Sequence, residues 1–391
     1  MDLDRFRNSP VGSLIPFSGV DFNGVEYHHE AFAPNPLTDE PTLSGSTWRA
    51  VTRANRALGR LHQGARFVSM PSLLRQPTLR REAQSTSALE GTFAPLEDVL
   101  AADVIDRSDR SSALAEVLNF VDAAERAFAW VSASRPLTVG LICELHRTLV
   151  SGTSADTEDA GRIRTIHVAI GSRGGSVEDA RFLPMRPGPQ LEAGFNDLIN
   201  WIKEKDATQV DPVIAAAMVH YQFETLHPFN DGNGRLGRLL IVVQLLQAQM
   251  LPDSLLSVSP WFEARRDQYQ ESLAEVSATG NWDQWIDFFA QGLEASANDT
   301  AKRLETVLGI QSSYQLRLRE AGLTGIVRDV ADFMVGSPYA TVRQLSDANG
   351  KTYQANSNAV NKLVDIGILE EITTGSRRIF RAPEVVKAFR T

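Results

Sequence analysis

The chain has 391 residues, 43% of them hydrophobic, which is enough for two or three domains with sizeable cores. Its single cysteine, Cys143, excludes an internal disulfide and a cysteine-based zinc site, and its apolar neighbours favour a buried, structural thiol. A formal net charge of −9 argues against nucleic-acid binding by the whole surface and leaves a local basic face open. The N-terminus lacks the pattern of a secretory signal, and no apolar run approaches the roughly 20 residues of a membrane span. We therefore expect a soluble, cytoplasmic protein without membrane contact.

Helical spacing of apolar residues dominates the chain from Trp48 onward. Residues 1–45 are rich in Pro, Asn and Gly and carry no clear period, so we expect an extended arm there. The predicted fold is therefore mainly α. Its helices cover residues 48–62, 78–90, 95–105, 110–131, 136–151, 190–204, 211–226, 235–250, 259–278, 282–296 and about 300–320.

The helical pattern is interrupted at residues 160–189. Val168–Ile170 form a strand-like run, SRGG at 172–175 supplies turn residues, and Arg181–Leu183 can form a returning strand. This pattern predicts a β-hairpin within about 163–186. A surface loop without a role is the alternative.

The C-terminal segment has a different pattern. Helices at 327–335, 341–348 and about 352–366 precede two strand-like runs, ILEEIT and IFRA, which the turn GSRR joins. Three helices and a two-stranded wing indicate a winged helix-turn-helix domain.

The number and position of basic residues in this domain indicate whether its partner is DNA or protein. The presumed recognition helix offers Lys351 and Lys362 but no arginine, whereas base readout usually relies on arginine. Arg377, Arg378 and Arg381 in the wing could still touch a phosphate backbone. Contact with protein or another domain is favoured, and DNA binding stays open.

Residues 227–238 read HPFNDGNGRLGR and lie between two segments that are apolar nearly all round, as buried helices are. A charge removed from water costs several kcal/mol unless it is paired. Asp231 (−1), Arg235 (+1) and Arg238 (+1) do not balance one another, whereas an anionic ligand together with a metal would.

The backbone of this loop also suggests an anion site. Pro228 ends the first helix, Gly232 and Gly234 let the chain turn, and Asn233 between them tolerates a left-handed conformation. The second helix then begins, and a helix N-terminus binds anions. Arginines in a first turn are opposed by the helix dipole, so they are not placed there for helix stability.

Structural alternatives exist for several of these residues. An isolated His227 is explained as well by a helix-end role, Asp231 by capping of the turn, and Phe229 by anchoring the loop in the core. His220 lies two helical turns before His227, but no third nitrogen or sulfur ligand is in range, so a structural role is favoured over zinc. No Walker P-loop pattern occurs here.

HPFNDGNGRLGR resembles the Fic family signature HPFx[DE]GNGRxxR at every fixed position. The resemblance covers roughly residues 48–296, including EAQSTSALEGTF, YQFETLHPF, SPWFEARRDQY and GNWDQWIDFF. It implies a Fic-type helical core with a β-hairpin flap and transfer of a nucleotide, usually AMP from ATP, to a Ser, Thr or Tyr hydroxyl of a protein. The expected parts are an N-terminal arm and helices at 1–105, with an inhibitory helix at about 78–90, a catalytic core at 106–300, a connecting helix at 301–325 and a winged-helix domain at 326–391.

The resemblance also implies roles for residues at matching positions. His227 is the expected general base, Asp231 the expected Mg²⁺ ligand, and Arg235 and Arg238 are expected to bind the β- and γ-phosphates of ATP. Arg265 stands where family members commonly have Asn, which leaves the choice of ATP over other nucleotides less determined. The expected nucleotide-binding set is Gly232, Asn233, Gly234, Arg235, Leu236, Gly237, Arg238 and Arg265.

Glu90 lies in the last turn of a predicted helix that Gly91 caps, a position that the helix dipole disfavours for a carboxylate. TSALEG resembles the family's inhibitory pattern [ST]xxxE[GN], which implies that Glu90 pairs with Arg238 and that Thr86 helps to fix the helix. We therefore hypothesise self-inhibition. The same glutamate could instead position a water that removes AMP from a target.

The expected partners are ATP, Mg²⁺ and a target protein docked on the hairpin at about 163–186. Self-modification and a homodimer are left open. A DNA-binding regulator with a sensory Fic core is the rival class, and transfer of another nucleotide or of phosphate is a third alternative.

Overall fold

The computed structural model describes residues 1–20, 26–66, 72–171, 177, 179–205, 209–251, 253–374 and 377–390. It contains two compact units. Unit 1 comprises Met1–Ala57, Asp122–Met250 and Trp261–Ala295, and unit 2 comprises Leu58–Val121, Leu251–Pro260 and Ser296–Thr391. Four of the five boundaries fall within α2 (Gly45–Arg66), α5 (Ser112–Ser132), α10 (Ser259–Glu263) and α12 (Trp282–Glu320), and the fifth, between Met250 and Leu251, lies outside any helix. The predominance of helix confirms the predicted mainly α fold.

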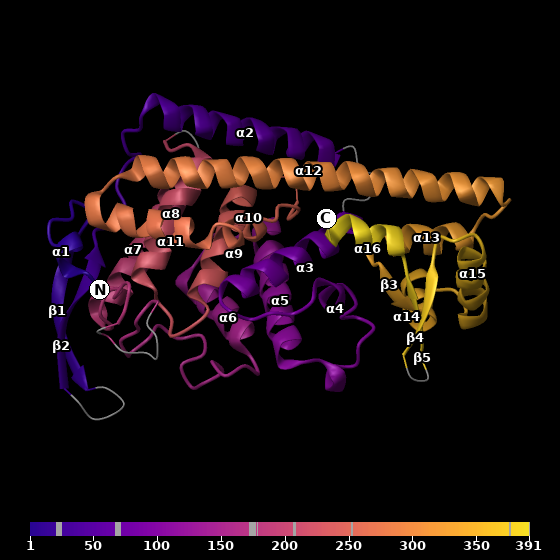
Figure 1. The fold of residues 1–391 in the computed structure, drawn as a ribbon, viewed down its shortest axis with the longest axis horizontal. Coiled ribbons are helices and arrows are strands. Elements are labelled where there is room, and N and C mark those ends of the chain that lie inside the picture. Colours follow the sequence, from indigo (N-terminus) through magenta and orange to yellow (C-terminus); the bar gives the residue numbers. More distant parts are fainter. Residues whose placement is uncertain are drawn as a thin grey trace. The chain divides into compact units, whose positions relative to one another are not determined.

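In unit 1, α8 (Pro212–Leu226) packs against α9 (Asn233–Gln247), α7 (Pro189–Glu204) and β2 (Glu26–Pro34) (Figure 1). α6 (Val139–Val150) packs on α7 and α9. Nearly every residue of α8 and α9 is buried, as their uninterrupted apolar sequence predicts. Asp211 caps α8 by accepting the Val213 N–H at 2.9 Å, and Pro212 starts the helix.

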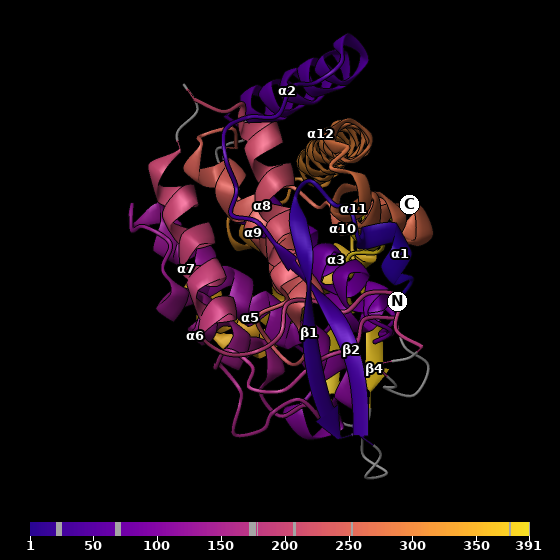
Figure 2. The same cartoon turned by 90° about the vertical axis from the view of Figure 1, so that its left-hand side faces the viewer.

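The expected extended arm is wrong for much of the first 45 residues. After the short α1 (Leu3–Phe6), β1 (Gly12–Val20) and β2 pair antiparallel as a hairpin, seen side by side in Figure 2. Pro16 and several glycines hide the alternating pattern of a strand, and proline is tolerated in an edge strand. Tertiary packing fixes the hairpin instead.

The predicted hairpin at 163–186, called the flap below, has little regular strand structure among its described residues. A single antiparallel bridge joins Ile170 to Phe182, and residues 172–176, which include the predicted turn, lie outside the described part. Phe32 of β2 donates its N–H to the Leu183 carbonyl at 2.8 Å, and Phe17 stacks on His167 with ring centroids 4.1 Å apart. The N-terminal hairpin therefore supports the flap.

Several predicted helix boundaries need correction. The segment 259–278 is two helices, because α10 ends at Glu263 and α11 (Arg266–Thr279) begins after a break at Arg265 (φ −131°). Residues 282–296 and 300–320 belong to the single 39-residue helix α12, since the polar residues between them include no Gly or Pro. α4 (Leu96–Leu100) is five residues long and ends well before residue 105.

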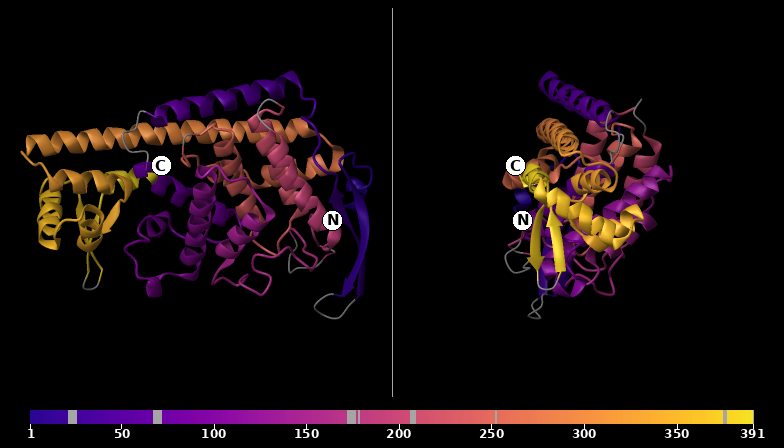
Figure 3. Two further views of the ribbon diagram at one scale, coloured as in Figure 1. Left: turned by 180° about the vertical axis from the view of Figure 1, so that it is seen from behind. Right: turned by 90° about the vertical axis from the view of Figure 1, so that its right-hand side faces the viewer.

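Unit 2 contains α3 (Ser72–Leu89), α4 and a 3-10 turn (Arg107–Asp109) besides the C-terminal elements. Three helices and two strands lie near their predicted positions: α13 (Ile326–Gly336), α14 (Val342–Asn349), α15 (Tyr353–Asp365), β4 (Glu370–Thr374) and β5 (Arg377–Arg381). β3 (Tyr339–Thr341) and α16 (Pro383–Arg390) were not predicted, and β3 makes the antiparallel sheet three-stranded, in the order β3-β5-β4 (yellow in Figure 3). Assignment to the winged-helix class remains a prediction.

Among the described helices, none has both the length and the apolar sequence that a membrane span requires.

Candidate active site

The HPFNDGNGRLGR segment joins α8 to α9 within unit 1. His227 ends α8 in the left-handed conformation (φ 51°, ψ 62°), with its N–H bonded to the Phe223 carbonyl at 2.9 Å. Gly232, also left-handed (φ 77°), precedes α9. Neither Asn233 nor Gly234 has a positive φ, so the turn uses His227 and Gly232 rather than the Asn233 position expected from the sequence.

His227 has a fixed ring orientation. Its Nδ1 lies 3.2 Å from the Glu224 carbonyl, which can only accept a hydrogen bond, so Nδ1 carries the proton in the neutral ring. The lone pair of the neutral ring is then on Nε2. His227 is half-buried. Its tautomer is therefore the one that a general base acting through Nε2 requires.

Arg164 stabilises the end of α8, and the sequence interpretation missed it. Its guanidinium donates to the carbonyls of His227 (2.7 Å), Leu226 (3.4 Å), Ile166 (3.0 Å) and Met185. A non-glycine residue in the left-handed region costs on the order of 1 kcal/mol or more, so His227 needs such support. In the sequence, the only signal of this role was an arginine within the run GRIRTIHVAIG.

Asn233 closes the loop on itself. Its Oδ1 accepts the Phe229 N–H at 3.0 Å, and its Nδ2 donates to the Phe229 carbonyl at 2.8 Å. Phe229 is fully buried, as predicted for a core anchor, and stacks on His146 with ring centroids 4.1 Å apart. The loop is therefore rigid at its centre.

His146, on α6, is a second site residue that the sequence interpretation missed. Its Nδ1 accepts the Gly161 N–H at 2.8 Å, which leaves Nε2 to donate to the Asp231 carbonyl at 3.0 Å. Burial lowers the pKa of His146 to about 4, so the ring is neutral at neutral pH. His146 thus fixes the backbone of Asp231 by a hydrogen bond to its carbonyl.

The Asp231 side chain is exposed, unlike the rest of the loop. One of its oxygens accepts the Gly232 N–H at 2.6 Å and lies 3.6 Å from a guanidinium nitrogen of Arg235. Mg²⁺ is commonly held by one or two carboxylates together with substrate phosphates. An exposed carboxylate beside a helix N-terminus fits that mode of binding.

The N-terminus of α9 has the geometry of an anion site. Gly232 provides no capping side chain, and the first backbone bond of the helix runs from the Leu236 N–H to the Gly232 carbonyl at 3.1 Å. The amides of a first helical turn have no partners within the helix and attract anions. Arg235 in that turn and Arg238 in the next are 2% and 1% exposed, and they add two buried positive charges.

Two motif positions have packing roles. Leu236 is buried in the core. A Cβ at Gly237 would lie 2.4 Å from the Glu224 carboxylate and 3.2 Å from the His220 ring, so only glycine allows α9 to approach α8 so closely.

Comparison with known proteins agrees with this geometry. Residues 136–245 match the sequence model of the Fic/DOC family, and residues 48–129 match that of the Fic/DOC family N-terminal region. A Fic/DOC domain is therefore present at residues 136–245. A protein adenylyltransferase fic-1 of Caenorhabditis elegans is 32% identical over 160 residues, which are 41% of this chain and 28% of that protein. A protein adenylyltransferase Fic of Nematostella vectensis is 30% identical over 158 residues, 40% of this chain and 32% of the relative. The matched region thus spans less than a third of each relative's length.

Solved structures share the Fic fold. A Fic family protein from Desulfovibrio desulfuricans G20 aligns with a TM-score of 0.56 and 20% identity, covering 88% of this chain and 98% of that chain. A Fic-1 fragment from C. elegans aligns with a TM-score of 0.51 and 22% identity, covering 66% and 74%.

Arg265 lies between α10 and α11, away in the chain from the other predicted nucleotide-binding residues at 232–238. It is exposed, stacks over the Trp261 ring at 4.4 Å and donates to the Trp261 carbonyl at 3.4 Å. Its role in binding a base in the Fic site stays a prediction.

His220 has the surroundings of a structural residue. It is fully buried, its Nε2 lies 2.6 Å from the Tyr269 hydroxyl, and burial lowers its pKa to about 3. Within the described residues no group of three or more His, Cys, Asp or Glu side chains could hold a metal ion. Cys143, expected to be buried, is half-buried, and burial raises the pKa of its thiol.

Glu90 and Thr86 belong to unit 2, at the end of α3. Thr86 is fully buried, and Glu90 is exposed. The Gly91 N–H bonds to the Ala88 carbonyl at 3.0 Å and the Thr92 N–H to the Ser87 carbonyl at 2.9 Å, while Gly91 has φ 94°. This is a Schellman cap, so the predicted glycine cap is confirmed, and Glu90 stands between Leu89, the last residue of α3, and the capping Gly91.

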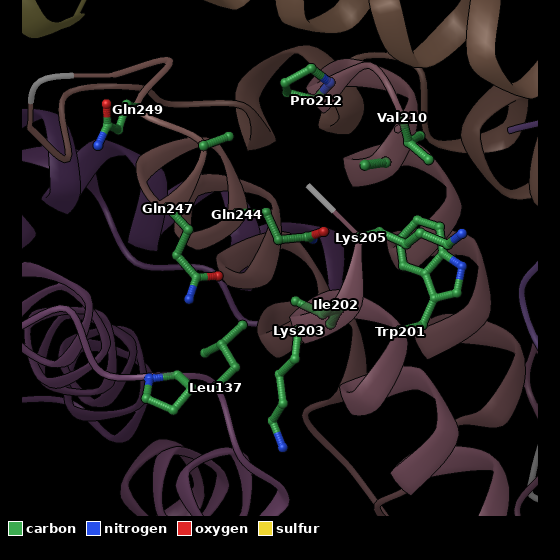
Figure 4. Close-up of a pocket in the computed structure, with 13 residues that line it drawn as sticks. Leu137, Trp201, Ile202, Lys203, Lys205, Val210, Pro212, Gln244, Gln247 and Gln249 are labelled. Carbon is green, nitrogen blue, oxygen red and sulfur yellow. The ribbon is translucent and has the colours of Figure 1, made fainter. Parts of the chain in front are cut away.

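A pocket of about 460 Å³ in unit 1 lies at the C-terminal end of α9, whereas the Fic motif is at its N-terminal end (Figure 4). Gln244, Gln247, Trp201 and Lys203 are among its lining residues. None of the predicted site residues lines it, so it is not the site of the motif chemistry.

Proposed function

We propose that this protein is a Mg²⁺-dependent adenylyltransferase that transfers AMP from ATP to a Ser, Thr or Tyr hydroxyl of a protein. The observation that carries the proposal is the α8–α9 junction, where a His227 ring of defined tautomer, an exposed carboxylate and a helix N-terminus with two arginines occur within residues 227–238. The relatives named protein adenylyltransferase support the same activity.

His227 is the proposed general base. As the acceptor oxygen attacks the α-phosphorus, Nε2 takes the hydroxyl proton. The bond from the oxygen to phosphorus forms while the bond between the α- and β-phosphates breaks, and pyrophosphate leaves with the electron pair. General bases of this kind typically contribute about 10²–10⁴-fold to the rate.

Arg235, Arg238 and the first amides of α9 are the proposed phosphate-binding groups. Buried guanidinium groups bind phosphate oxygens more strongly than exposed ones, because little water competes. Asn233 contributes by fixing the loop through Phe229, and Gly232 and Gly234 allow the phosphates to approach the main chain.

Asp231 would hold the Mg²⁺, with the remaining ligands coming from the phosphates and water. When bound, the ion would neutralise charge on the phosphates and on the leaving pyrophosphate. His146 and Gly232 position Asp231 through its carbonyl and its carboxylate.

Glu90 is the proposed inhibitor, through an ion pair with Arg238 that keeps this arginine from the γ-phosphate. The Schellman cap supports the proposal because it fixes the end of α3 and so gives the Glu90 side chain a defined origin. The flap at about 163–186 is the proposed docking site for the target, by addition of a strand.

Incubation with Mg²⁺-ATP followed by intact-mass spectrometry tests these roles. We expect Glu90→Gly to increase addition of one adenylate to acceptor proteins or to the chain itself, and the further change His227→Ala to abolish it. Glu90→Gln, which removes only the charge, should also activate, whereas Asp98→Asn, at an exposed carboxylate on α4, should not.

Different outcomes separate the alternatives. Loss of adenylate from a premodified acceptor would favour AMP removal, with Glu90 positioning a water. Labelled UTP or GTP incorporated in place of ATP would assign another nucleotide. No transfer with Glu90→Gly and any of the three would contradict the proposed activity.

The DNA-binding alternative receives little support from the wing. Arg378 forms two hydrogen bonds with Glu371 (2.7 and 2.8 Å) and one with Asn361, and Arg381 pairs with Glu370 at 2.5 Å. Side chains engaged in this way, with acidic partners beside them, are poor phosphate contacts. We therefore favour a protein or domain contact for this segment.

A further inference from the structure

Arg164 is a buried cation whose guanidinium hydrogen bonds, within the described residues, all go to main-chain carbonyls. Its guanidinium belongs to a residue that is 1% exposed, and burial lowers its pKa to about 10, so it stays charged at neutral pH. Within the described part of the chain no carboxylate pairs with it. Burying a charge without a carboxylate partner costs several kcal/mol, whereas an apolar side chain that served packing alone would carry no such cost.

The four carbonyls that accept from the guanidinium belong to two different segments of the chain. Leu226 and His227 end α8, whereas Ile166 and Met185 lie near the two ends of the flap. The Arg164 N–H also donates to the Pro228 carbonyl at 2.9 Å. Because a guanidinium is planar and rigid, one group fixes both ends of the flap relative to the last residues of α8.

We infer that Arg164 is a positioning residue, which sets the distance between the flap and His227 and so places an acceptor hydroxyl within reach of the ring. The inference rests on the proposed function and adds a determinant of acceptor geometry outside the HPFNDGNGRLGR segment. A displacement of about 1 Å between reacting groups can lower a rate about 10²-fold, so a single lost hydrogen bond at this point has consequences.

Arg164→Lys tests the inference in the Glu90→Gly parent, because it keeps the charge but loses the planar group. Calorimetry gives the Kd for Mg²⁺-ATP, and intact-mass spectrometry gives the rate of AMP transfer to a His227→Ala copy of the chain, used as the acceptor. We expect the rate to fall at least about tenfold while the Kd changes less than about twofold. Arg162→Lys, an exposed arginine two residues earlier, should change neither.

Transfer at the parent rate by Arg164→Lys would overturn the inference. So would a parallel loss of rate and nucleotide affinity, because that result indicates a merely structural role. A parent chain that transfers no AMP contradicts the proposed function instead.

Native-state hydrogen exchange of the unmodified chain gives an independent result, even where Arg164→Lys does not fold. The amides to follow are those of Ile170 and Phe182 within the flap, that of His227 at the end of α8, and that of Arg164, which bonds to the Pro228 carbonyl. If Arg164 links the two segments, they open with one common free energy. Clearly separate opening free energies would overturn the inference.

Discussion

Three arginines in unit 1 and two arginines on strand β5 of unit 2 lie in opposite environments. Arg164, Arg235 and Arg238 are at most 2% exposed, whereas the side chains of Arg378 and Arg381 are 40% and 32% exposed. Arg378 and Arg381 each have a glutamate within 2.7 Å, whereas Arg164 binds carbonyls and Arg235 has the Asp231 carboxylate at 3.6 Å.

The comparison shows that the number of arginines in a segment says little about its function. A buried guanidinium carries a desolvation cost that indicates a purpose, either positioning of the main chain or binding of a ligand. An exposed guanidinium paired with glutamate contributes about 0–1 kcal/mol and indicates a surface contact. Four predictions test this contrast, from the largest expected effect to the smallest.

Arg164→Ala should destabilise the protein by about 3 kcal/mol or more, since it leaves buried carbonyls without their donor. Arg378→Ala should cost less than about 1 kcal/mol, because its pair with Glu371 is exposed. Urea unfolding followed by circular dichroism measures both. Equal effects would remove the contrast between the two regions.

Stability should fall as the pH is lowered from about 6.5 towards 4. The folded-state pKa of His146 is about 4 and that of His220 about 3, both below the ordinary value of 6.5. The unfolded chain therefore binds protons first, and the stability from the neutral rings is complete above pH 6.5 and lost on acidification. The contribution of His146 alone is on the order of 3 kcal/mol.

Urea unfolding at pH 7.5, 5.5 and 4.5 checks this dependence. His146→Gln should weaken it, whereas His28→Gln, at an exposed histidine of β2, should not. The segment 326–391 has no histidine and should contribute nothing of this kind. A flat profile in this window would contradict the burial of neutral histidines.

Arg238→Ala in the Glu90→Gly parent should weaken binding of Mg²⁺-ATP by about 10- to 100-fold, since a charge-assisted hydrogen bond contributes about 1.5–3 kcal/mol. Arg381→Ala should leave the affinity unchanged. Isothermal titration calorimetry gives both constants. Unchanged binding with Arg238→Ala would mean that burial of this arginine serves packing alone.

Duplex DNA should bind weakly and without sequence preference, at about 10⁻⁴–10⁻⁶ M in physiological salt. Arg378→Ala should change that affinity less than about twofold, because Glu371 already engages the guanidinium. A gel-shift titration measures the affinity. Tight, sequence-dependent binding would overturn the protein-contact interpretation of the wing.

Much of the fold follows from the sequence. The apolar residues of α8 and α9, the Pro and Asp at the start of α8 and the Gly91 cap of α3 are local signals, and the elements lie near where these signals place them. The β1–β2 hairpin was missed because Pro16 interrupts its pattern and because its partner, the flap, lies about 150 residues away. Packing between segments far apart in the chain does not require a periodic pattern of apolar residues within a short strand.

The sequence by itself determined the mainly helical fold and the twelve-residue segment that carries the chemistry, since both depend on local spacing and on side-chain type. Only the tertiary structure decided how that segment is held. The carbonyl of the left-handed His227 accepts a hydrogen bond from Arg164, 63 positions away, and the Asp231 carbonyl accepts one from His146, 85 positions away. Hydrogen bonds from side chains to distant main-chain carbonyls depend on where the chain folds back, which residue types do not encode one at a time.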